Sequence, residues 1–338
     1  MIAVIGAGLA GCFTAHAFAA QGVDVHIFER GGGFGAGASG NLAGALHPQL
    51  TAAPSKHGQF YADSFRKMVA LLDDLQRRTS YPFWQQCGAL WLAETPEQQT
   101  RYQKIAAQAY CADLVAWVDT ATASTIAGVE VAHPALFLPT AGWVRPALLC
   151  QVLCSAFPEK ITVHFDTALT TLQKQGKYWV LNGNFTTQRV VIANASAALQ
   201  LPQTAHLPLQ ITRGQVTYLP ATPESQALQT ILCGNSYVIP AIDGKHVIGA
   251  TFQRHDTDTA NRLSDTAHNL HAVQQLLPQW RNWLTSLDAE SLESRAGLRA
   301  SFPDHLPRFE WLEDGLGIAL GLGSRGLVSA IANTLLQR

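Results

Sequence analysis

The first thirty residues decide the fold: MIAVIGAGLAGCFTAHAFAAQGVDVHIFER (residues 1–30). The apolar run at residues 2–5 is typical of a strand buried on both faces of a parallel sheet. A helix is predicted over residues 11–20, because small and apolar residues fill that stretch and Gly22 then ends it. Alternation at residues 23–28 predicts a second strand. Together these elements form one βαβ unit.

Three glycines between the first strand and the helix predict a dinucleotide site. Gly6, Gly8 and Gly11 form the pattern Gly-x-Gly-x-x-Gly. Gly6 permits a tight turn, Gly8 lets backbone amides approach a pyrophosphate, and Gly11 lets the helix pack close to the strand. The helix N-terminus adds partial positive charge at the same place. The pattern alone is weak evidence, but the strand before it and the helix and strand after it supply the required context.

The second strand ends on Glu29, and a glycine-rich segment follows it at residues 31–48. A carboxylate at this point can accept hydrogen bonds from both ribose hydroxyls and would repel a 2′-phosphate, which disfavours NADP. A surface acid and a low-complexity linker are the alternative interpretations. An NAD dehydrogenase would continue with further βα repeats, whereas an extended flavin needs a second loop. The hydroxyl and amide groups at residues 38–41 fit that loop, so we expect non-covalently bound FAD.

Composition limits the other classes of function. The chain has 338 residues, enough for two domains, and its formal net charge of −1 gives no global argument for binding nucleic acid. Its six cysteines show neither a CxxC pair nor zinc-like spacing, so no metal site is expected. Residues 1–22 lack a basic start, and no apolar run reaches the roughly 18 residues of a membrane span. We therefore expect a cytoplasmic protein without a membrane partner.

Further elements follow from periodicity and turn residues. Helices are predicted over residues 58–78, 97–110, 146–157 and 264–277, and strands within residues 161–192, 211–219 and 237–252. The last stretch, residues 317–337, predicts a strand, a glycine loop and a closing helix. Nucleotide-fold strands at both ends of the chain indicate a discontinuous domain.

Seven segments carry a family resemblance: IGAGLAG (5–11), GASGNLAGALHPQL (37–50), RGQVTYLP (213–220), CGNSYVIP (233–240), GATF (249–252), RAGLRASFPDHLP (295–307) and GLGSRGL (321–327). With them the chain resembles, over nearly its full length, the glycine oxidase and D-amino-acid oxidase superfamily of FAD enzymes. Within that superfamily it is most similar to the oxidoreductase domain of the bifunctional tRNA 5-methylaminomethyl-2-thiouridine biosynthesis proteins, MnmC. No methyltransferase segment is recognised, so a stand-alone oxidase half is expected, with a separate methyltransferase acting on its product.

The resemblance implies an α/β fold with a Rossmann-like FAD-binding domain of the glutathione-reductase-like, D-amino-acid oxidase type. We assign residues 1–80, 140–210 and 290–338 to it, and residues 81–139 and 211–289 to an inserted α+β substrate domain.

The resemblance also implies a reaction. The substrate would be a carboxymethylaminomethyl group on the wobble uridine of a tRNA. Oxidation of its C–N bond beside the carboxylate, followed by hydrolysis, would release glyoxylate and leave aminomethyl-uridine. Two alternatives stay open: a glycine- or sarcosine-type amine oxidase acting on free amino acids, and a non-catalytic flavin-binding module.

Arg299 is the first candidate for binding the substrate carboxylate, because a guanidinium offers a carboxylate two parallel hydrogen bonds. In the resembled oxidases the arginine of the Gly-Leu-Arg motif has that role. A structural salt bridge with Asp304 or Glu293 is the alternative. The resemblance adds Tyr237 as a substrate-facing tyrosine. Arg325 is predicted to contact the substrate or to stabilise the reduced, anionic flavin.

Four further residues are weaker candidates. Arg213 and Gln215 are expected to line the substrate cavity. His305 is a candidate base, although a structural histidine is equally compatible with its position, and His47 is expected to face the flavin with the same alternative. The predicted FAD-contacting residues are Gly6, Ala7, Gly8, Leu9, Ala10, Gly11, Glu29, Arg30, Ala38, Ser39, Gly40, Asn41, Leu169, Asn194, Ala195, Gly323, Ser324, Gly326 and Leu327.

Overall fold

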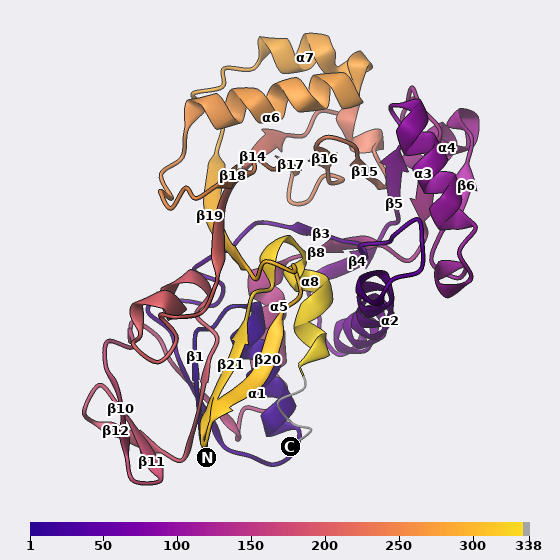
Figure 1. Cartoon of the computed structure of the whole chain (residues 1–338). Helices are drawn as coiled ribbons and strands as arrows, with labels where there is room; N and C mark the ends of the chain where they lie inside the picture. Colours follow the sequence, from indigo (N-terminus) through magenta and orange to yellow (C-terminus); the bar gives the residue numbers. More distant parts are fainter. Residues whose placement is uncertain (334–338) are drawn as a thin grey trace.

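A six-stranded sheet forms the base of the molecule (Figure 1). A computed structural model describes residues 1–333. Strand β1 (Ile2–Ile5) lies inside the sheet, paired in parallel with β2 (Val25–Phe28) and β13 (Arg189–Ile192). Outside these lie β9 (Ile161–His164) and β21 (Leu316–Leu320), and β20 (Arg308–Glu313) closes one edge antiparallel to β21. Segments from both ends of the chain therefore build one sheet.

The side chains of β1 alternate between two cores, which explains why all four of its residues are buried. Ile2 and Val4 belong to the core that contains α1 (Leu9–Ala19) and α5 (Pro146–Ser155). Ala3 and Ile5 point to the opposite side, where they join apolar residues of a three-stranded meander. The meander consists of β10 (Leu172–Gln175), β11 (Tyr178–Leu181) and β12 (Phe185–Thr187).

A larger sheet forms the other half of the molecule. Its central long strand, β14 (Gln210–Pro220), pairs with β17 (Lys245–Gly249), β18 (Gln253–Arg254) and β19 (Ser294–Ser301). The order then continues through β16 (Tyr237–Val238), β15 (Ile231–Cys233), β5 (Ala89–Leu92), β7 (Ala135–Leu138) and β6 (Ala116–Val118). Helix α6 (Leu263–Leu276) packs on β14 and β17, and α7 (Arg281–Ser286) lies beside it (Figure 1).

A further small sheet and four further helices complete the described fold. The small sheet β3 (Gly44–Leu46), β8 (Gly142–Val144) and β4 (Trp84–Gln86) lies between the two halves in Figure 1. The other helices are α2 (Lys56–Arg77), α3 (Pro96–Ala106), α4 (Thr120–Ala127) and α8 (Gly326–Ser329).

The predicted α/β class with a parallel nucleotide-binding sheet is confirmed. Three details differ. Residues 294–301 pair with β14 in the larger sheet, although we assigned them to the FAD-binding part. The expected strand at 237–252 is two short strands separated by a turn. The closing helix ends at Ser329 and a 3₁₀ turn follows it to Ala332, while residues 334–337 of the predicted helix lie outside the described residues. The division into two domains stays a prediction.

No helix within residues 1–333 is long and apolar enough to cross a membrane.

Candidate active site

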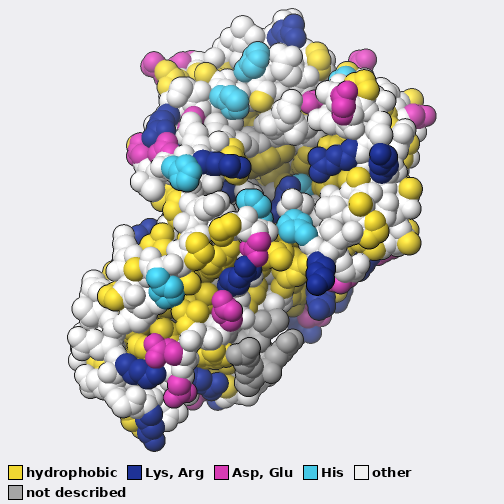
Figure 2. Space-filling model, in the orientation of Figure 1, with side chains coloured by type: hydrophobic (Ala, Val, Ile, Leu, Met, Phe, Trp, Pro, Cys, Tyr) yellow, Lys and Arg dark blue, Asp and Glu magenta, His cyan; other side chains and the backbone are white. Residues whose placement is uncertain are grey.

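A cavity of about 730 Å³ lies between the two halves, within the size range of cofactor sites. It begins at the carboxyl ends of β1 and β2, where parallel sheets commonly bind ligands, and ends among residues of the larger sheet. Figure 2 shows the molecule hollowed between its two lobes, with arginine, lysine and histidine side chains gathered around the hollow. The cavity is therefore elongated across both lobes and partly open.

The glycine turn forms one end of this cavity. Gly6 has φ +106°, and a Cβ there would lie 2.9 Å from the carbonyl oxygen of Ala193. A Cβ on Gly11 would overlap the carbonyl oxygen of Gly6, so only glycine lets the helix approach the strand. A Cβ on Gly8 would lie 3.3 Å from Oγ of Ser39, which accepts a hydrogen bond from the amide of Leu9. The second loop thus contacts the start of α1.

Glu29 fixes the glycine turn from the neighbouring strand. Its Oε2 accepts a 2.7 Å hydrogen bond from the amide of Ala7, and its Oε1 accepts one of 2.9 Å from Gly31. The side chain is only 7% exposed and lines the cavity. Each oxygen retains a further acceptor site, so Glu29 can bind ribose hydroxyls while it holds the turn.

The end of the cavity that lies in the nucleotide-binding half can accommodate an adenosine. Leu169, Asn194 and Ala195 line it, as the predicted contacts require. Oδ1 of Asn194 is buried without a hydrogen-bond partner among the described residues, so it is free to accept a hydrogen bond from a ligand. Phe28 and Gln200 also line this end. Sequence reasoning missed them, although Phe28 immediately precedes Glu29 at the end of the predicted strand.

Most of the predicted cofactor-contacting residues line the cavity, including those of the loop at residues 323–327. Ala7, Gly11 and Gly40 do not. The amide of Ala7 is directed to Glu29, and Gly11 packs against Gly6. Gly40 lies against the guanidinium of Arg295, whose Nη1 donates to Oδ1 of Asn41. These three residues lie behind the residues that line the cavity.

Arg299 lies in the opposite half of the cavity. Burial lowers the pKa of its guanidinium, and nearby Tyr237 opposes that change. Its one hydrogen-bond acceptor among the described residues is the carbonyl oxygen of Thr251, 3.3 Å from Nη1. Its side chain crosses Gly214, where any Cβ would overlap the guanidinium. The space for Arg299 therefore depends on that glycine.

The alternative salt bridges proposed for Arg299 are not formed. Asp304 pairs with Arg308 at 2.5 Å, and Glu293 pairs with Lys245 at 2.5 Å. Arg299 thus remains without a carboxylate among the described residues. A half-buried guanidinium that lines a cavity in this state is a candidate for binding an anion.

Arg325 is a second half-buried arginine in the same cavity. Burial lowers the pKa of its guanidinium, and the charge of Arg299 lowers it further. Its Nη1 lies 3.1 Å from Nε2 of His47, which also lines the cavity. The pKa of His47 is held well below its usual range, first by burial and then by the charge of Arg325. His47 is therefore a neutral acceptor and does not neutralise the arginine.

Tyr237 lines the cavity beside Arg299. Burial raises the pKa of its phenol to about 12, while the nearby charge of Arg299 opposes the rise. The hydroxyl is protonated at neutral pH and can donate a hydrogen bond to a substrate anion. The structure thus brings together Arg299, Arg325 and Tyr237, which are distant in the sequence.

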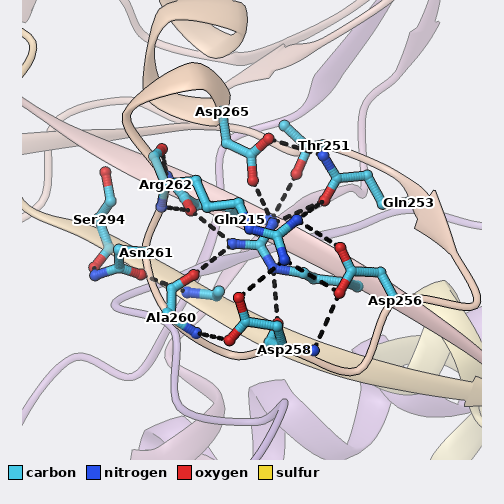
Figure 3. A network of polar contacts seen from close by, with 12 residues as sticks. Gln215, Thr251, Gln253, Asp256, Asp258, Ala260, Asn261, Arg262, Asp265 and Ser294 are labelled. Atoms are coloured by element: carbon cyan, nitrogen blue, oxygen red, sulfur yellow. Dashed lines mark hydrogen bonds and ion pairs between the residues drawn. The ribbon is translucent and has the colours of Figure 1, made fainter.

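Arg213 does not line the cavity, which corrects the expectation for it. The side chain is fully buried and forms an ion pair with Asp265. It also donates to Gln253 and to the carbonyl oxygens of Asp258 and Ala260. Figure 3 shows this network, with Gln253, Asp258, Ala260 and Asp265 labelled. All the hydrogen-bonding directions of the guanidinium are used, so none is left for a substrate.

Gln215 belongs to the same network. Its Oε1 accepts from Arg213 at 3.0 Å, and its Nε2 donates to the carbonyl oxygen of Arg262 at 2.9 Å. His305 also lies outside the cavity lining and is exposed. Its carbonyl oxygen accepts a hydrogen bond from the hydroxyl of Tyr61. The geometry thus gives Gln215 and His305 structural contacts and no direct approach to a substrate.

Residues 1–333 contain no group of three or more histidine, cysteine or acidic residues placed to hold a metal ion.

Several curated proteins that are similar to this chain share one name. The chain is 34% identical over 340 residues to the "tRNA 5-methylaminomethyl-2-thiouridine biosynthesis bifunctional protein MnmC" of Nitrosospira multiformis, covering 97% of this chain and 54% of that protein. The protein of the same name from Chromohalobacter salexigens is 36% identical over 368 residues, covering 97% and 52%. The chain therefore spans about half the length of these relatives.

Solved structures share the fold. Glycine oxidase from Geobacillus kaustophilus has a TM-score of 0.83 at 24% identity, covering 99% of this chain and 92% of that one. Iminodiacetate oxidase from Chelativorans has a TM-score of 0.79 at 19% identity, covering 98% and 93%. The family model described as FAD dependent oxidoreductase, DAO, matches residues 1–333. The chain belongs to this DAO family and is an FAD-dependent oxidoreductase.

Proposed function

We propose that the protein oxidises the carboxymethylaminomethyl group on the wobble uridine of tRNA. A C–H bond is broken on the carbon that lies between the amine nitrogen and the carboxylate. Water then hydrolyses the resulting C=N bond to give glyoxylate and aminomethyl-uridine. Bound FAD supplies the acceptor for the two electrons removed. The remaining tasks of binding the carboxylate and orienting the amine belong to the protein.

The two arginines that line the cavity carry this proposal. Burial and then the charge of Arg299 lower the pKa of Arg325, and neither guanidinium forms a salt bridge with a carboxylate among the described residues. A substrate carboxylate would supply the missing negative charge. Tyr237 would donate a further hydrogen bond to it.

The same arginines favour the reactive form of the amine. A positive charge nearby disfavours an ammonium, so Arg299 and Arg325 lower the pKa of a bound amine. A neutral amine is the form from which a C–H bond is readily oxidised. No dedicated base is required for this step.

The tRNA part of the proposal is supported by the names of these relatives, which are tRNA biosynthesis proteins. A separate methyltransferase would then act on the aminomethyl product. The second candidate is oxidation of free glycine or sarcosine, which is supported by the same carboxylate-binding arginines and by the fold shared with glycine oxidase. The two candidates differ in what the cavity mouth admits.

Anaerobic mixing separates the candidates. The oxidised holoprotein is mixed with tRNA that carries carboxymethylaminomethyl-uridine, and in parallel with glycine and with sarcosine. The proposal expects rapid bleaching of the flavin absorbance by the tRNA and slow or no bleaching by the free amino acids. Bleaching by glycine or sarcosine alone would establish the second candidate instead.

A further inference from the structure

Phe252 is the most exposed large apolar side chain among residues 1–333. It is 56% exposed, and it is the one exposed large hydrophobic residue of that set that lines the cavity. Exposed single hydrophobic residues are common on protein surfaces. One at the mouth of an active site, beside the proposed carboxylate anchor, calls for a specific contact.

The backbone on both sides of Phe252 is held firmly. The amide of Thr251 donates a hydrogen bond to the carbonyl oxygen of Gln215. In return, Oγ1 of Thr251 accepts a hydrogen bond of 2.9 Å from the amide of Gln215. Gln253 is bound to Arg213 and to Asp265 at 2.9 Å each. Thr251 is buried and Gln253 is half-buried, whereas the side chain of Phe252 between them is exposed. The two held residues therefore present the ring outward.

The buried network in Figure 3, in which Thr251, Gln253 and Asp265 are labelled, holds this segment in place. Thr251, Gln253 and Asp265 do not line the cavity, but the network fixes the segment that presents Phe252. An apolar ring would otherwise be expected to turn inward, because burial of apolar area is favourable. The ring is therefore displayed at the cavity mouth by a rigid support.

Two cations flank the ring. The guanidinium carbon of Arg299 lies 5.9 Å from its centroid, and that of Arg254 also lies 5.9 Å from it. Arg299 lines the cavity and is half-buried, whereas Arg254 is exposed. A ligand that reaches from Arg299 across the ring toward Arg254 would meet first a carboxylate site, then an aromatic face, then an exposed positive charge.

That order matches a nucleotide with a carboxylate at the end of a short side chain. Nucleobases stack on aromatic side chains, and arginine adds cation–π and phosphate contacts in single-stranded nucleic acid sites. Free glycine or sarcosine has no ring to cover Phe252. We propose that Phe252 is the stacking platform for the pyrimidine ring that carries the carboxymethylaminomethyl group. This inference rests on the proposed function.

Three variants test the platform. Phe252→Leu keeps apolar bulk but removes the aromatic face, and Phe252→Tyr keeps the ring. Tyr178→Leu is the matched control, because Tyr178 is 40% exposed, carries Lys177 over its ring at 5.4 Å and lies on β11 outside the cavity lining. The flavin content of each holoprotein checks that the fold is kept.

Two measurements are made on each variant. The first is anaerobic flavin reduction by tRNA carrying carboxymethylaminomethyl-uridine, as a function of tRNA concentration. The second is the change in flavin absorbance on titration with glycolate, a small carboxylate that has no ring. Loss of one base stack predicts that Phe252→Leu weakens the tRNA reaction by roughly 5- to 150-fold. Phe252→Tyr, Tyr178→Leu and all glycolate titrations should match the wild type.

The outcomes are distinguishable. If wild-type flavin is not reduced by the tRNA, the proposed function fails and the platform fails with it. If the wild type is active and Phe252→Leu is equally active, only the platform is overturned. It is also overturned if Phe252→Leu weakens glycolate binding as much as the tRNA reaction, because the ring would then act on the carboxylate site.

Discussion

Nη1 of Arg325 and Nε2 of His47 lie 3.1 Å apart inside the cavity. Arginine can only donate, so Nε2 must be the acceptor and cannot carry a proton. Nδ1 of His47 then carries the proton and lies 3.4 Å from the carbonyl oxygen of Pro48. Arg325 is thus oriented by a neutral group and keeps its full charge for a ligand.

This relationship predicts a pH dependence of stability. The pKa of His47 is lower in the folded protein than the unfolded value of about 6.5, so the unfolded state binds more protons below that pH. The free energy of unfolding should therefore fall as the pH falls below about 6.5, by up to about 1.4 kcal/mol per pH unit for this residue. In His47→Gln, whose side-chain oxygen can accept the bond from Arg325, the loss should be smaller.

Urea unfolding of both proteins between pH 5 and 8 measures this difference. His206→Gln, a change at an exposed histidine, is the control and should follow the wild type. Parallel curves for the wild type and His47→Gln would contradict the assignment of a neutral His47.

Arg299→Ala should keep the flavin and lose turnover. Removing one partner of a buried charge pair costs about 2–5 kcal/mol, so kcat/KM should fall between about 30-fold and several thousand-fold. Arg299→Lys should restore little, because an ammonium cannot form the two parallel bonds. The rate of flavin reduction is measured against tRNA concentration. Arg66→Ala, at a surface arginine paired with Asp113, is the control, and undiminished turnover in Arg299→Ala would refute the anchor.

Glu29→Ala should lose FAD. The change leaves the amides of Ala7 and Gly31 without their acceptor and removes the partner proposed for the ribose. An unsatisfied buried amide costs about 1–3 kcal/mol, so both FAD affinity and the stability of the apoprotein should fall. The ratio of flavin to protein absorbance and the Tm of the apoprotein measure the two effects. Glu94→Ala, at a glutamate outside the cavity lining, serves for comparison, and full FAD occupancy in Glu29→Ala would contradict the assignment.

Asp265→Ala should destabilise the larger sheet. It leaves the fully buried guanidinium of Arg213 without its carboxylate, a change that costs about 3–5 kcal/mol. The combined variant Arg213→Met with Asp265→Ala should recover part of that loss, because no unpaired charge remains. Thermal unfolding of the single and double variants measures this. Additive losses would show that the two residues do not form the pair seen here.

Local sequence rules predicted the nucleotide half well, because its determinants are close together in the chain. Gly6, Gly8, Gly11 and Glu29 lie within one βαβ unit, and the FAD-binding fold and cofactor they indicated are confirmed. The roles of Arg299, Tyr237 and Arg325 came from resemblance and general carboxylate chemistry. They stay predictions, although the structure places all three in one cavity.

The other differences depend on contacts between distant residues. Arg213 looked available to a substrate because its partner Asp265 lies 52 positions away. Residues 294–301 looked like part of the nucleotide half because they precede its last strands, yet they pair with β14. The exposure of Phe252 has no local signal, since apolar residues in a strand are usually buried.

Analysis of the products by mass spectrometry tests the central claim most directly. The holoprotein is incubated with tRNA carrying carboxymethylaminomethyl-uridine, the tRNA is digested to nucleosides, and glyoxylate is measured in the same reaction. The account predicts aminomethyl-uridine and glyoxylate in equal amounts, and neither product with Arg299→Ala. Unchanged carboxymethylaminomethyl-uridine, together with oxidation of free glycine by the same preparation, would contradict it.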